Sequence, residues 1–421
     1  MARSNAIVLG AGIVGVSVAL HLAKRGLSVA LVDRNDPGRG TSYGNAGIIE
    51  GNTLFPAAFP SSLGALLRIA FKQASEANYH FAHLLHVAPW LLAFRRNSAP
   101  ERLIATMEAM RPLFACAVAE HEALMAEAGA QKYLRHTGWL KLYRSDRGFA
   151  ATARERAIGA ELGLPLRALD TEAARTLEPS LAPVFRHAVF WEKAASVSDP
   201  LGVTRAYAAR FAALGGIMVK GDAMSLHRSR PGTGGLWRVE TAQGPIDAEA
   251  AVVALGPWAP DLLKRHGIAL PFAVKRGYHR HFRPRGNAGL ARPILDADVG
   301  YCLAPMEQGI RLTTGVEFAT RDAPPTPVQL QRVTPAATEL FPLGDPVEDK
   351  PWMGARPCFA DSRPVIGRAP GQPGLWLACG HGHSGLTLGP ATGRLLAEMM
   401  TDATPYCDPK PYAVERFAKG Q

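Results

Sequence analysis

Three glycines near the N-terminus have the spacing of a dinucleotide-binding turn. Gly10, Gly12 and Gly15 follow an apolar segment, Asn5 to Leu9, and precede a segment with helical periodicity. In such a turn the first glycine permits a tight bend and the second lets backbone N–H groups approach a pyrophosphate. The third lets the helix pack against the strand. The positive end of that helix favours a phosphate, so the spacing predicts a nucleotide cofactor.

An acidic residue completes this motif. A second apolar segment, Ser28 to Val32, ends at Asp33. The two segments and the helix between them predict a βαβ unit with a parallel sheet. Asp33 would then accept hydrogen bonds from the ribose hydroxyls at the carboxyl end of the second strand. The motif alone does not distinguish NAD from FAD.

Three later segments favour FAD. The polar, glycine-rich segment Thr41 to Gly47 suits a flavin that continues past the pyrophosphate. The apolar strand Ala250 to Leu255, which ends at Gly256, would pass close to the ADP moiety. The turn Gly380 to Gly385 precedes a helix and would offer N–H groups to the N1/O2 edge of the flavin, which becomes anionic on reduction.

The remaining periodicity indicates how these pieces are arranged. Helical tracts are expected from Leu63 to Phe94, from Pro100 to Gly129 and from Pro390 to Met400, and several β-strands between Phe272 and Glu317. We therefore predict an α/β fold with a Rossmann-type FAD-binding domain interleaved with a substrate domain built on a large, mainly antiparallel sheet. The FAD-binding segments are expected at 1–62, 201–265 and 351–421, and the substrate-domain segments at 63–200 and 266–350.

Composition restricts partners and compartment. The 421 residues carry a net charge of +11 without any nucleic-acid-binding module, so no nucleic-acid partner is expected. The charge leaves two readings open: a scattered basic surface, or attraction to anionic lipid. The five cysteines are widely spaced, which argues against a disulfide framework and indicates a reducing compartment. We expect a cytoplasmic protein, with peripheral contact at the inner face of the membrane left open.

Taken together, these features resemble a known superfamily. The chain is similar to the FAD-dependent oxidoreductases of the D-amino-acid oxidase/glycine oxidase superfamily, and most of all to the bacterial D-amino-acid dehydrogenase branch (small subunit). The similarity extends over almost the whole chain in order. The segments that carry it are Val8–Gly15, Thr41–Gly47, Pro89–Leu92, Arg95–Asn97, Lys275–Tyr278, Gly354–Pro357, Asp361, Pro364–Gly367 and Gly380–Thr387.

The resemblance implies non-covalent FAD, because the offset of Cys358 from Asp361 does not fit the cysteine that some relatives attach to flavin. No metal is expected, since His381 and His383 lack a third ligand candidate nearby. The residues expected to bind the cofactor are Gly10, Gly12, Ile13, Val14, Gly15, Asp33, Arg34, Thr41, Ser42, Asn45, Ala46, Gly47, Met224, Gly256, Gly382, Gly385, Leu386 and Thr387.

The resemblance also implies four substrate-site residues. Arg356 would hold a carboxylate with its planar fork. Tyr278 matches a strand position from which a side chain can reach the pocket, although a core tyrosine is the alternative. His383 and Ser384 would face the substrate. This His-Ser pair departs from the dehydrogenase branch, so substrate preference stays open.

The expected reaction is oxidative deamination of a small amino acid, most of all a D-amino acid, by hydride transfer from the α-carbon to flavin N5. An imine forms and is hydrolysed to a 2-oxo acid and ammonia. The alternatives are oxidation of glycine, sarcosine, hydroxyproline or an opine, or an FAD-carrying electron-transfer subunit without independent activity. The electron acceptor would be a quinone, oxygen or a redox protein, and the family likeness favours a quinone chain.

Overall fold

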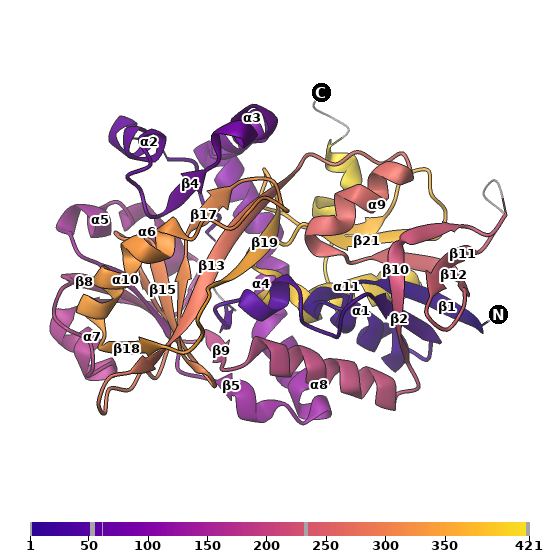
Figure 1. Ribbon diagram of the computed structural model, residues 1–421, viewed down its shortest axis with the longest axis horizontal. Coiled ribbons are helices and arrows are strands. Elements are labelled where there is room, and N and C mark those ends of the chain that lie inside the picture. The colour runs from indigo at the N-terminus through magenta and orange to yellow at the C-terminus, as the bar shows by residue number, and fades with distance from the viewer. Residues whose placement is uncertain (1, 51–54, 61, 231–234, 418–421) are drawn as a thin grey trace.

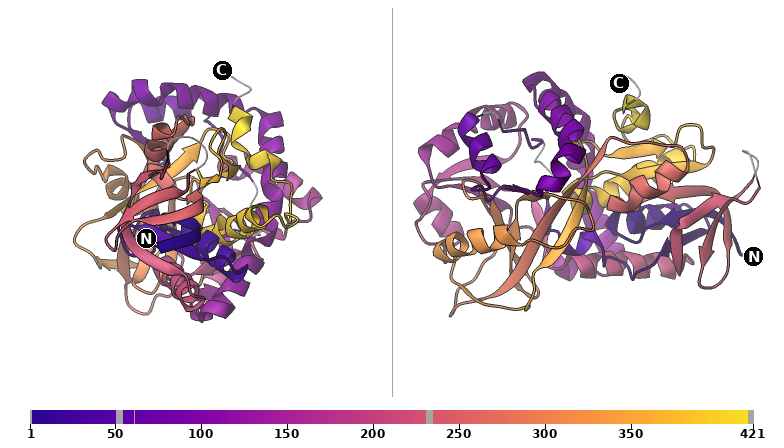
Figure 2. Two further views of the ribbon diagram at one scale, coloured as in Figure 1. Left: turned by 90° about the vertical axis from the view of Figure 1, so that its right-hand side faces the viewer. Right: turned by 45° about the horizontal axis from the view of Figure 1, so that its top comes forward.

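The computed structural model describes residues 2–50, 55–60, 62–230 and 235–417, which form two lobes lying side by side (Figure 1; right-hand view of Figure 2). The first lobe contains a seven-stranded sheet of order β1-β2-β10-β11-β12-β21-β20, with a further pairing of β1 with β12. Its strands are β1 (Ala2–Leu9), β2 (Val29–Asp33), β10 (Ile217–Arg228), β11 (Trp237–Thr241), β12 (Ile246–Val253), β20 (Val365–Arg368) and β21 (Leu375–Cys379).

Helices cover both faces of this sheet, which explains why its parallel strands are apolar throughout. Along β1, Ala6 and Val8 pack into one hydrophobic cluster, whereas Ile7 and Leu9 pack into another on the opposite face. The first cluster includes side chains of α1 (Ile13–Lys24), α4 (Pro100–Ala128), α8 (Pro200–Ala213) and α11 (Gly385–Met400), and the second includes those of α9 (Ala259–Arg265).

The second lobe is built on an eleven-stranded, mainly antiparallel sheet in which β13 (Phe272–Pro284) pairs with four other strands. The other strands are β4 (Ala77–Tyr79), β6 (Trp139–Tyr143), β7 (Leu166–Asp170), β8 (His187–Trp191), β14 (Ile294–Asp296), β15 (Tyr301–Met306), β16 (Gly309–Thr314), β17 (Val316–Phe318), β18 (Leu343–Pro346) and β19 (Trp352–Phe359). Helix α10 (Val328–Leu340) packs on it, and a small sheet joins β3 (Ile48–Ile49), β9 (Ala195–Val197) and β5 (Leu134–Arg135). The predicted fold class is confirmed.

The predicted helix from Leu63 to Phe94 is wrong as a single element. The structure has α2 (Leu63–Ala70), the strand β4, and α3 (Phe81–Asn97). The break arises because β4 pairs with β17 at the edge of the large sheet, and this tertiary pairing overrides local helix propensity. The short helices α5 (Asp146–Ala150), α6 (Ala153–Glu161) and α7 (Thr171–Leu177) complete this lobe.

The last helix begins earlier than predicted, at Gly385 instead of Pro390. A proline inside a helix cannot donate to the carbonyl four residues before it, here that of Leu386. The buried His121 of α4 donates to that carbonyl instead, through Nε2 at 2.8 Å. Burial lowers the pKa of His121 to about 4, so the ring is neutral and suited to this role. A proline that looked like a helix start is therefore tolerated within the helix.

The division into five segments stays a prediction, and two elements bear on its boundaries. Strand β19 falls in the expected FAD-binding segment 351–421 but pairs with β13 of the large sheet. Helix α4 falls in the expected substrate segment 63–200 but packs against α8 and α11.

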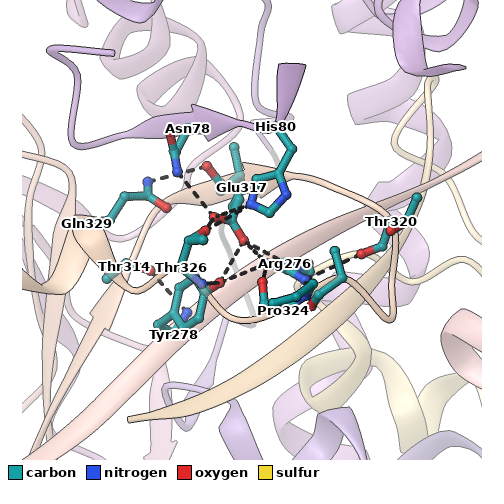
Figure 3. A network of polar contacts seen from close by, with 12 residues as sticks. Asn78, His80, Arg276, Tyr278, Thr314, Glu317, Thr320, Pro324, Thr326 and Gln329 are labelled. Atoms are coloured by element: carbon teal, nitrogen blue, oxygen red, sulfur yellow. Dashed lines mark hydrogen bonds and ion pairs between the residues drawn. The ribbon is translucent and has the colours of Figure 1, made fainter. Parts of the chain in front are cut away.

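A buried polar network fastens β4 to the large sheet (Figure 3). The Glu317 carboxylate accepts hydrogen bonds from Arg276 Nε at 2.8 Å, from the Tyr278 hydroxyl at 2.7 Å and from Asn78 Nδ2 at 3.1 Å. Arg276 and Glu317 are both fully buried. Removing one partner of such a pair leaves an uncompensated charge in a medium of low dielectric constant.

We therefore expect Glu317→Ala to lower the free energy of unfolding by about 3–5 kcal/mol. Glu249→Ala is the matched control, because it removes an exposed ion pair with Arg3 and should cost about 0–1 kcal/mol. Urea unfolding followed by circular dichroism measures both. Equal losses in the two variants would contradict a stabilising role for the network.

Candidate active site

A cavity of about 710 Å³ lies where the two lobes meet. Its lining comes from the β1–α1 turn, the ends of β2 and β12, and the first turn of α11 in one lobe, and from β13 and β19 in the other. Its volume lies within the range of about 300–1,000 Å³ that is usual for cofactor and ligand sites.

The glycine turn at one end of the cavity leaves no room for side chains. Gly10 has a φ of +104°, and a Cβ there would lie 2.5 Å from the carbonyl oxygen of Ala254. A Cβ on Gly15 would lie 1.8 Å from the carbonyl oxygen of Gly10. Helix α1 begins at Ile13 without a side-chain cap. Its first N–H groups therefore lack intrahelical partners and form a suitable site for an anion.

Asp33 stands at the end of β2 and holds this turn in place. Its Oδ2 accepts from the backbone N–H of Ala11 at 2.7 Å, and its Oδ1 from that of Asn35 at 2.8 Å. A carboxylate has about four acceptor sites, so Asp33 keeps capacity for hydroxyl donors in the cavity. The guanidinium of Arg34 lies 5.1 Å from the ring centre of Trp258, which also lines the cavity.

The segment Thr41 to Gly47 is tied to both lobes. The Thr41 hydroxyl donates to a carbonyl of β19 at 2.8 Å, and the Ser42 hydroxyl accepts from Ile13 N–H at 3.0 Å. The Asn45 amide donates to the carbonyl of His383 at 3.1 Å. These bonds connect the loop to the start of α1 and to the turn before α11.

Arg311, which the sequence analysis did not identify, supports the same loop from β16. Its Nη1 donates to the carbonyl oxygens of Tyr43, at 2.9 Å, and Asn45, and its Nε donates to His281 Nε2 at 2.9 Å. Burial lowers the pKa of Arg311 to about 10, so it is charged at neutral pH. No local motif marks an arginine in a strand as the support of a loop more than 260 residues away.

Helices α1 and α11 pack closely enough that both N-termini reach the cavity. A Cβ on Gly393 would lie 2.7 Å from the backbone of Ser17, and one on Gly389 would lie 3.1 Å from Ile13. The first turn of α11 lines the cavity through Gly385 and the two residues after it. The cavity therefore receives the positive ends of two helices.

The cavity brings together nearly all of the residues predicted to bind the cofactor. The exceptions are Gly15 and Gly47, which do not line it and instead pack against the carbonyl groups of Gly10 and Val197. Lining residues that sequence reasoning missed include Glu50, Asp222, Ala223, Trp258, Asp261, Arg265, Arg321 and Trp352.

Arg356 lies in the cavity wall on β19. Its Nη1 donates to the carbonyl of Gly315 at 2.9 Å, and its Nη2 to that of Thr314 at 3.2 Å. Gly277 makes room for it, because a Cβ there would lie 2.5 Å from Nη2. Burial lowers its pKa, and no carboxylate of the described residues forms an ion pair with it. The arrangement leaves a partly buried cation available to an anionic ligand.

Tyr278 does not reach into the cavity as predicted. Strand pairing places Arg356 opposite Lys275, and side chains alternate along β13, so Tyr278 points to the other face of the sheet. There its hydroxyl donates to Glu317 and accepts from Thr326 N–H at 2.8 Å. Tyr278 is a core residue that borders the cavity only from within its strand.

His383 and Ser384 lie at the boundary between this cavity and a smaller one of about 70 Å³. His383 lines both cavities, whereas Ser384 lines only the smaller. Burial, reinforced by the charges of Arg356 and Lys275, lowers the pKa of His383 to about 4. The imidazole is therefore neutral at pH 7.

The chain matches the model of a family described as FAD dependent oxidoreductase over residues 5–399. The chain belongs to this family. It is 29% identical to the D-amino acid dehydrogenase of Chromohalobacter salexigens, over 98% of the chain and 99% of that protein, and 29% identical to the D-amino-acid oxidase of Bradyrhizobium diazoefficiens, over 97% and 98%. The crystal structure of glycine oxidase from Geobacillus kaustophilus covers 99% of each chain with a TM-score of 0.75 at 23% identity and shows the same fold.

The lining of the cavity fits FAD. Close backbone approach at Gly10 and the unpaired N–H groups of two helix N-termini suit a cofactor with an anionic pyrophosphate at one end and a flavin edge that becomes anionic on reduction at the other. The FAD-dependent oxidoreductase thus has its cofactor site at the junction of its two lobes.

The contacts of Arg311 generate a prediction about FAD affinity. Arg311→Met removes charged hydrogen bonds to the 41–47 loop, each worth about 1.5–3 kcal/mol. We expect the dissociation constant of FAD to rise at least about tenfold, measured by flavin fluorescence on titration of the apoprotein.

Arg280→Met serves as the matched control. Arg280 lies on β13 and donates to the carbonyls of Glu348 and Asp349, away from the loop. Equal FAD affinity in the two variants would show that Arg311 does not support the cofactor loop.

Proposed function

We propose that this flavoprotein oxidises the α-carbon of a small D-amino acid, with Arg356 binding the substrate carboxylate. The observation that carries the proposal is the guanidinium of Arg356, which lines the FAD cavity and is held only by backbone carbonyls among the described residues. A planar, always-charged donor of this kind is suited to bidentate binding of a carboxylate.

The proposed cofactor contacts follow from the geometry of the cavity. The N–H groups of the Gly10–Val14 turn would bind the pyrophosphate, Asp33 the ribose, and the first turn of α11 the N1/O2 edge of the flavin. The proposed binding is non-covalent. Cys358 supports this, because it lines only the smaller cavity and burial raises the pKa of its thiol, which keeps it in the unreactive protonated form.

When bound, FAD accepts a hydride from the α-carbon at N5, leaving an imine that water hydrolyses to a 2-oxo acid and ammonia. Arg356 contributes orientation, because fixing the carboxylate limits how the α-C–H bond can face the cofactor. His383 stays neutral beside Arg356 and adds no positive charge that would oppose formation of the iminium. The amine must react in its neutral form, and its proton can leave to solvent.

The D configuration is supported by the names of the two relatives that cover nearly the full chain, a dehydrogenase and an oxidase of D-amino acids. Glycine is an alternative substrate, supported by the glycine oxidase of Pseudomonas putida, which is 28% identical over 97% of the chain. Sarcosine, hydroxyproline or an opine, and a role as an electron-transfer subunit, are separated from these by one experiment.

That experiment is anaerobic reduction of the purified holoprotein by single substrates. We expect D-amino acids to bleach the flavin absorbance near 450 nm, with their L-enantiomers at least about tenfold slower (roughly 1.4 kcal/mol). Glycine, sarcosine and hydroxyproline test the alternatives. If no amine reduces the flavin, the chain is not an independent amino-acid oxidoreductase.

The role of Arg356 has its own test. Arg356→Leu leaves the substrate carboxylate without its partner, and loss of one member of a buried charge pair costs about 2–5 kcal/mol. We expect KM for the amino acid to rise about 100-fold while FAD content is retained. Arg368→Leu, at an exposed position over Trp376, is the control and should leave KM unchanged. An unchanged KM in the Arg356 variant would exclude carboxylate binding.

We further propose that the electron acceptor is a membrane quinone and that α2 and α3 contact the lipid surface. None of the helices in the described part of the chain has the length and apolar character needed to cross a bilayer. Both helices project from the large sheet at the top of Figure 1. Their exposed apolar residues are Leu63, Leu67, Phe71, Phe81, Leu85 and Leu92, and the cations among them are Arg68, Lys72, Arg95 and Arg96. Apolar and cationic residues on one surface suit an anionic membrane.

A vesicle assay tests this contact. We expect the holoprotein to sediment with phosphatidylglycerol vesicles and not with phosphatidylcholine vesicles, since each basic residue near an anionic surface adds about 1 kcal/mol. Phe71→Ser combined with Leu85→Ser should reduce binding at least about tenfold, because both side chains are largely exposed and available to lipid. Leu214→Ser, on the other lobe, is the control. Absence of binding to either vesicle would contradict the proposal.

A further inference from the structure

Two cations face each other across neighbouring strands in the wall of the site. Lys275 of β13 is the register partner of Arg356 of β19. Paired residues of two strands project to the same face of a sheet, and their Cβ atoms lie about 4.5–5.5 Å apart. Like charges directly opposite each other destabilise a sheet, so this pair has an unfavourable interaction that the fold retains.

No carboxylate compensates either charge among the described residues. The Lys275 ammonium lies over the rings of Trp90, at 4.7 Å, and Phe94, at 4.6 Å, both from α3. Arg356 donates only to backbone carbonyls. Burial lowers the pKa of both groups, and both depress the pKa of His383. The site therefore has a locally positive potential.

This situation differs from that of other buried arginines in the chain. Arg276 pairs with Glu317, and Arg416 donates to Asp361 at 2.8 Å. Burying a charge is costly unless it is paired. The pair at the cavity wall has no such partner, which is the pattern expected where the missing anions arrive with the ligand.

The two cations belong to adjoining cavities. Arg356 lines the main cavity and Lys275 lines the smaller one. Glu50, His383 and the Gly380–Gly382 segment line both, so they form the wall that the two spaces share. A molecule held by Arg356 beside the flavin can therefore place a short arm toward Lys275.

We propose that the preferred substrate carries two carboxylates: Arg356 binds the carboxylate on the reacting carbon, and Lys275 binds the second. The class comprises dicarboxylic amino acids, such as aspartate and glutamate, and secondary amines with a carboxylate on each arm. This inference rests on the proposed function of Arg356 as the carboxylate anchor. It adds Lys275 as the residue that selects among amino acids.

Glu50 is the acidic side chain in the shared wall, and its environment is compatible with a second carboxylate. Burial raises its pKa to about 7, and its charged neighbours are Lys141 and Glu155, not Lys275 or Arg356. It is thus partly protonated at neutral pH, and a protonated carboxyl can donate a hydrogen bond to an anion.

The test compares isosteric substrates with the holoenzyme. The pairs are aspartate with asparagine and glutamate with glutamine, each as both enantiomers, and iminodiacetate with sarcosine. We expect kcat/KM to favour the dicarboxylate over its neutral partner by at least about 30-fold in the wild type. Lys275→Met should reduce this ratio to about threefold or less, Lys275→Arg should largely retain it, and the exposed Lys350→Met should leave it unchanged.

Binding without turnover gives an independent readout. Succinate should perturb the flavin absorption spectrum at lower concentration than butyrate in the wild type, and Lys275→Met should remove the difference. Equal efficiency with amide and acid substrates, or an unaltered ratio in Lys275→Met, overturns the dicarboxylate inference while leaving amino-acid oxidation intact. Failure of every amine to reduce the flavin overturns the proposed function itself.

Discussion

The backbone-to-backbone packing of α1 against α11 is the constraint on which the cofactor site depends. Glycines at 389 and 393 let α11 approach Ser17 and Ile13 of α1 more closely than any side chain would permit. The two helices come from opposite ends of the chain, yet both begin at the same cavity. This packing therefore converts two separate strand–turn–helix units into one site with two positive helix ends, and the sheet beneath them only has to hold their strands in register.

The second lobe completes the site with charges instead of helix dipoles. Arg311 holds the loop that lies against the cofactor cavity, Arg356 and Lys275 project from neighbouring strands, and Arg276 with Glu317 fixes the edge of the same sheet. The three positions differ in how the charge is compensated: by carbonyls, by no anion of the described residues, and by a buried carboxylate. That difference separates structural cations from those available to a ligand.

Sequence reasoning succeeded where chemistry is local. The spacing of Gly10, Gly12 and Gly15 and the position of Asp33 predicted the turn and the fold class, because turn, helix and strand are neighbours in the chain. It failed where partners are distant. Tyr278 shares a strand with residues of the cavity wall, and only the register with β19 shows that its side chain points away. The start of α11 was misplaced because His121, far away in sequence, replaces the hydrogen bond that Pro390 cannot make. Pairwise register and remote donors carry no local signal.

The cofactor cavity is lined by residues from Gly10 to Thr387 of a 421-residue chain. A nascent chain emerging from the ribosome therefore presents the pyrophosphate turn early and the second helix N-terminus almost last. Neither half contains a complete binding site. Loading with FAD is consequently a post-translational event, and until it occurs the newly made protein holds two inward-facing helix ends and a set of buried cations without their anion. In a cell short of riboflavin, unloaded chains would be the ones most exposed to proteolysis.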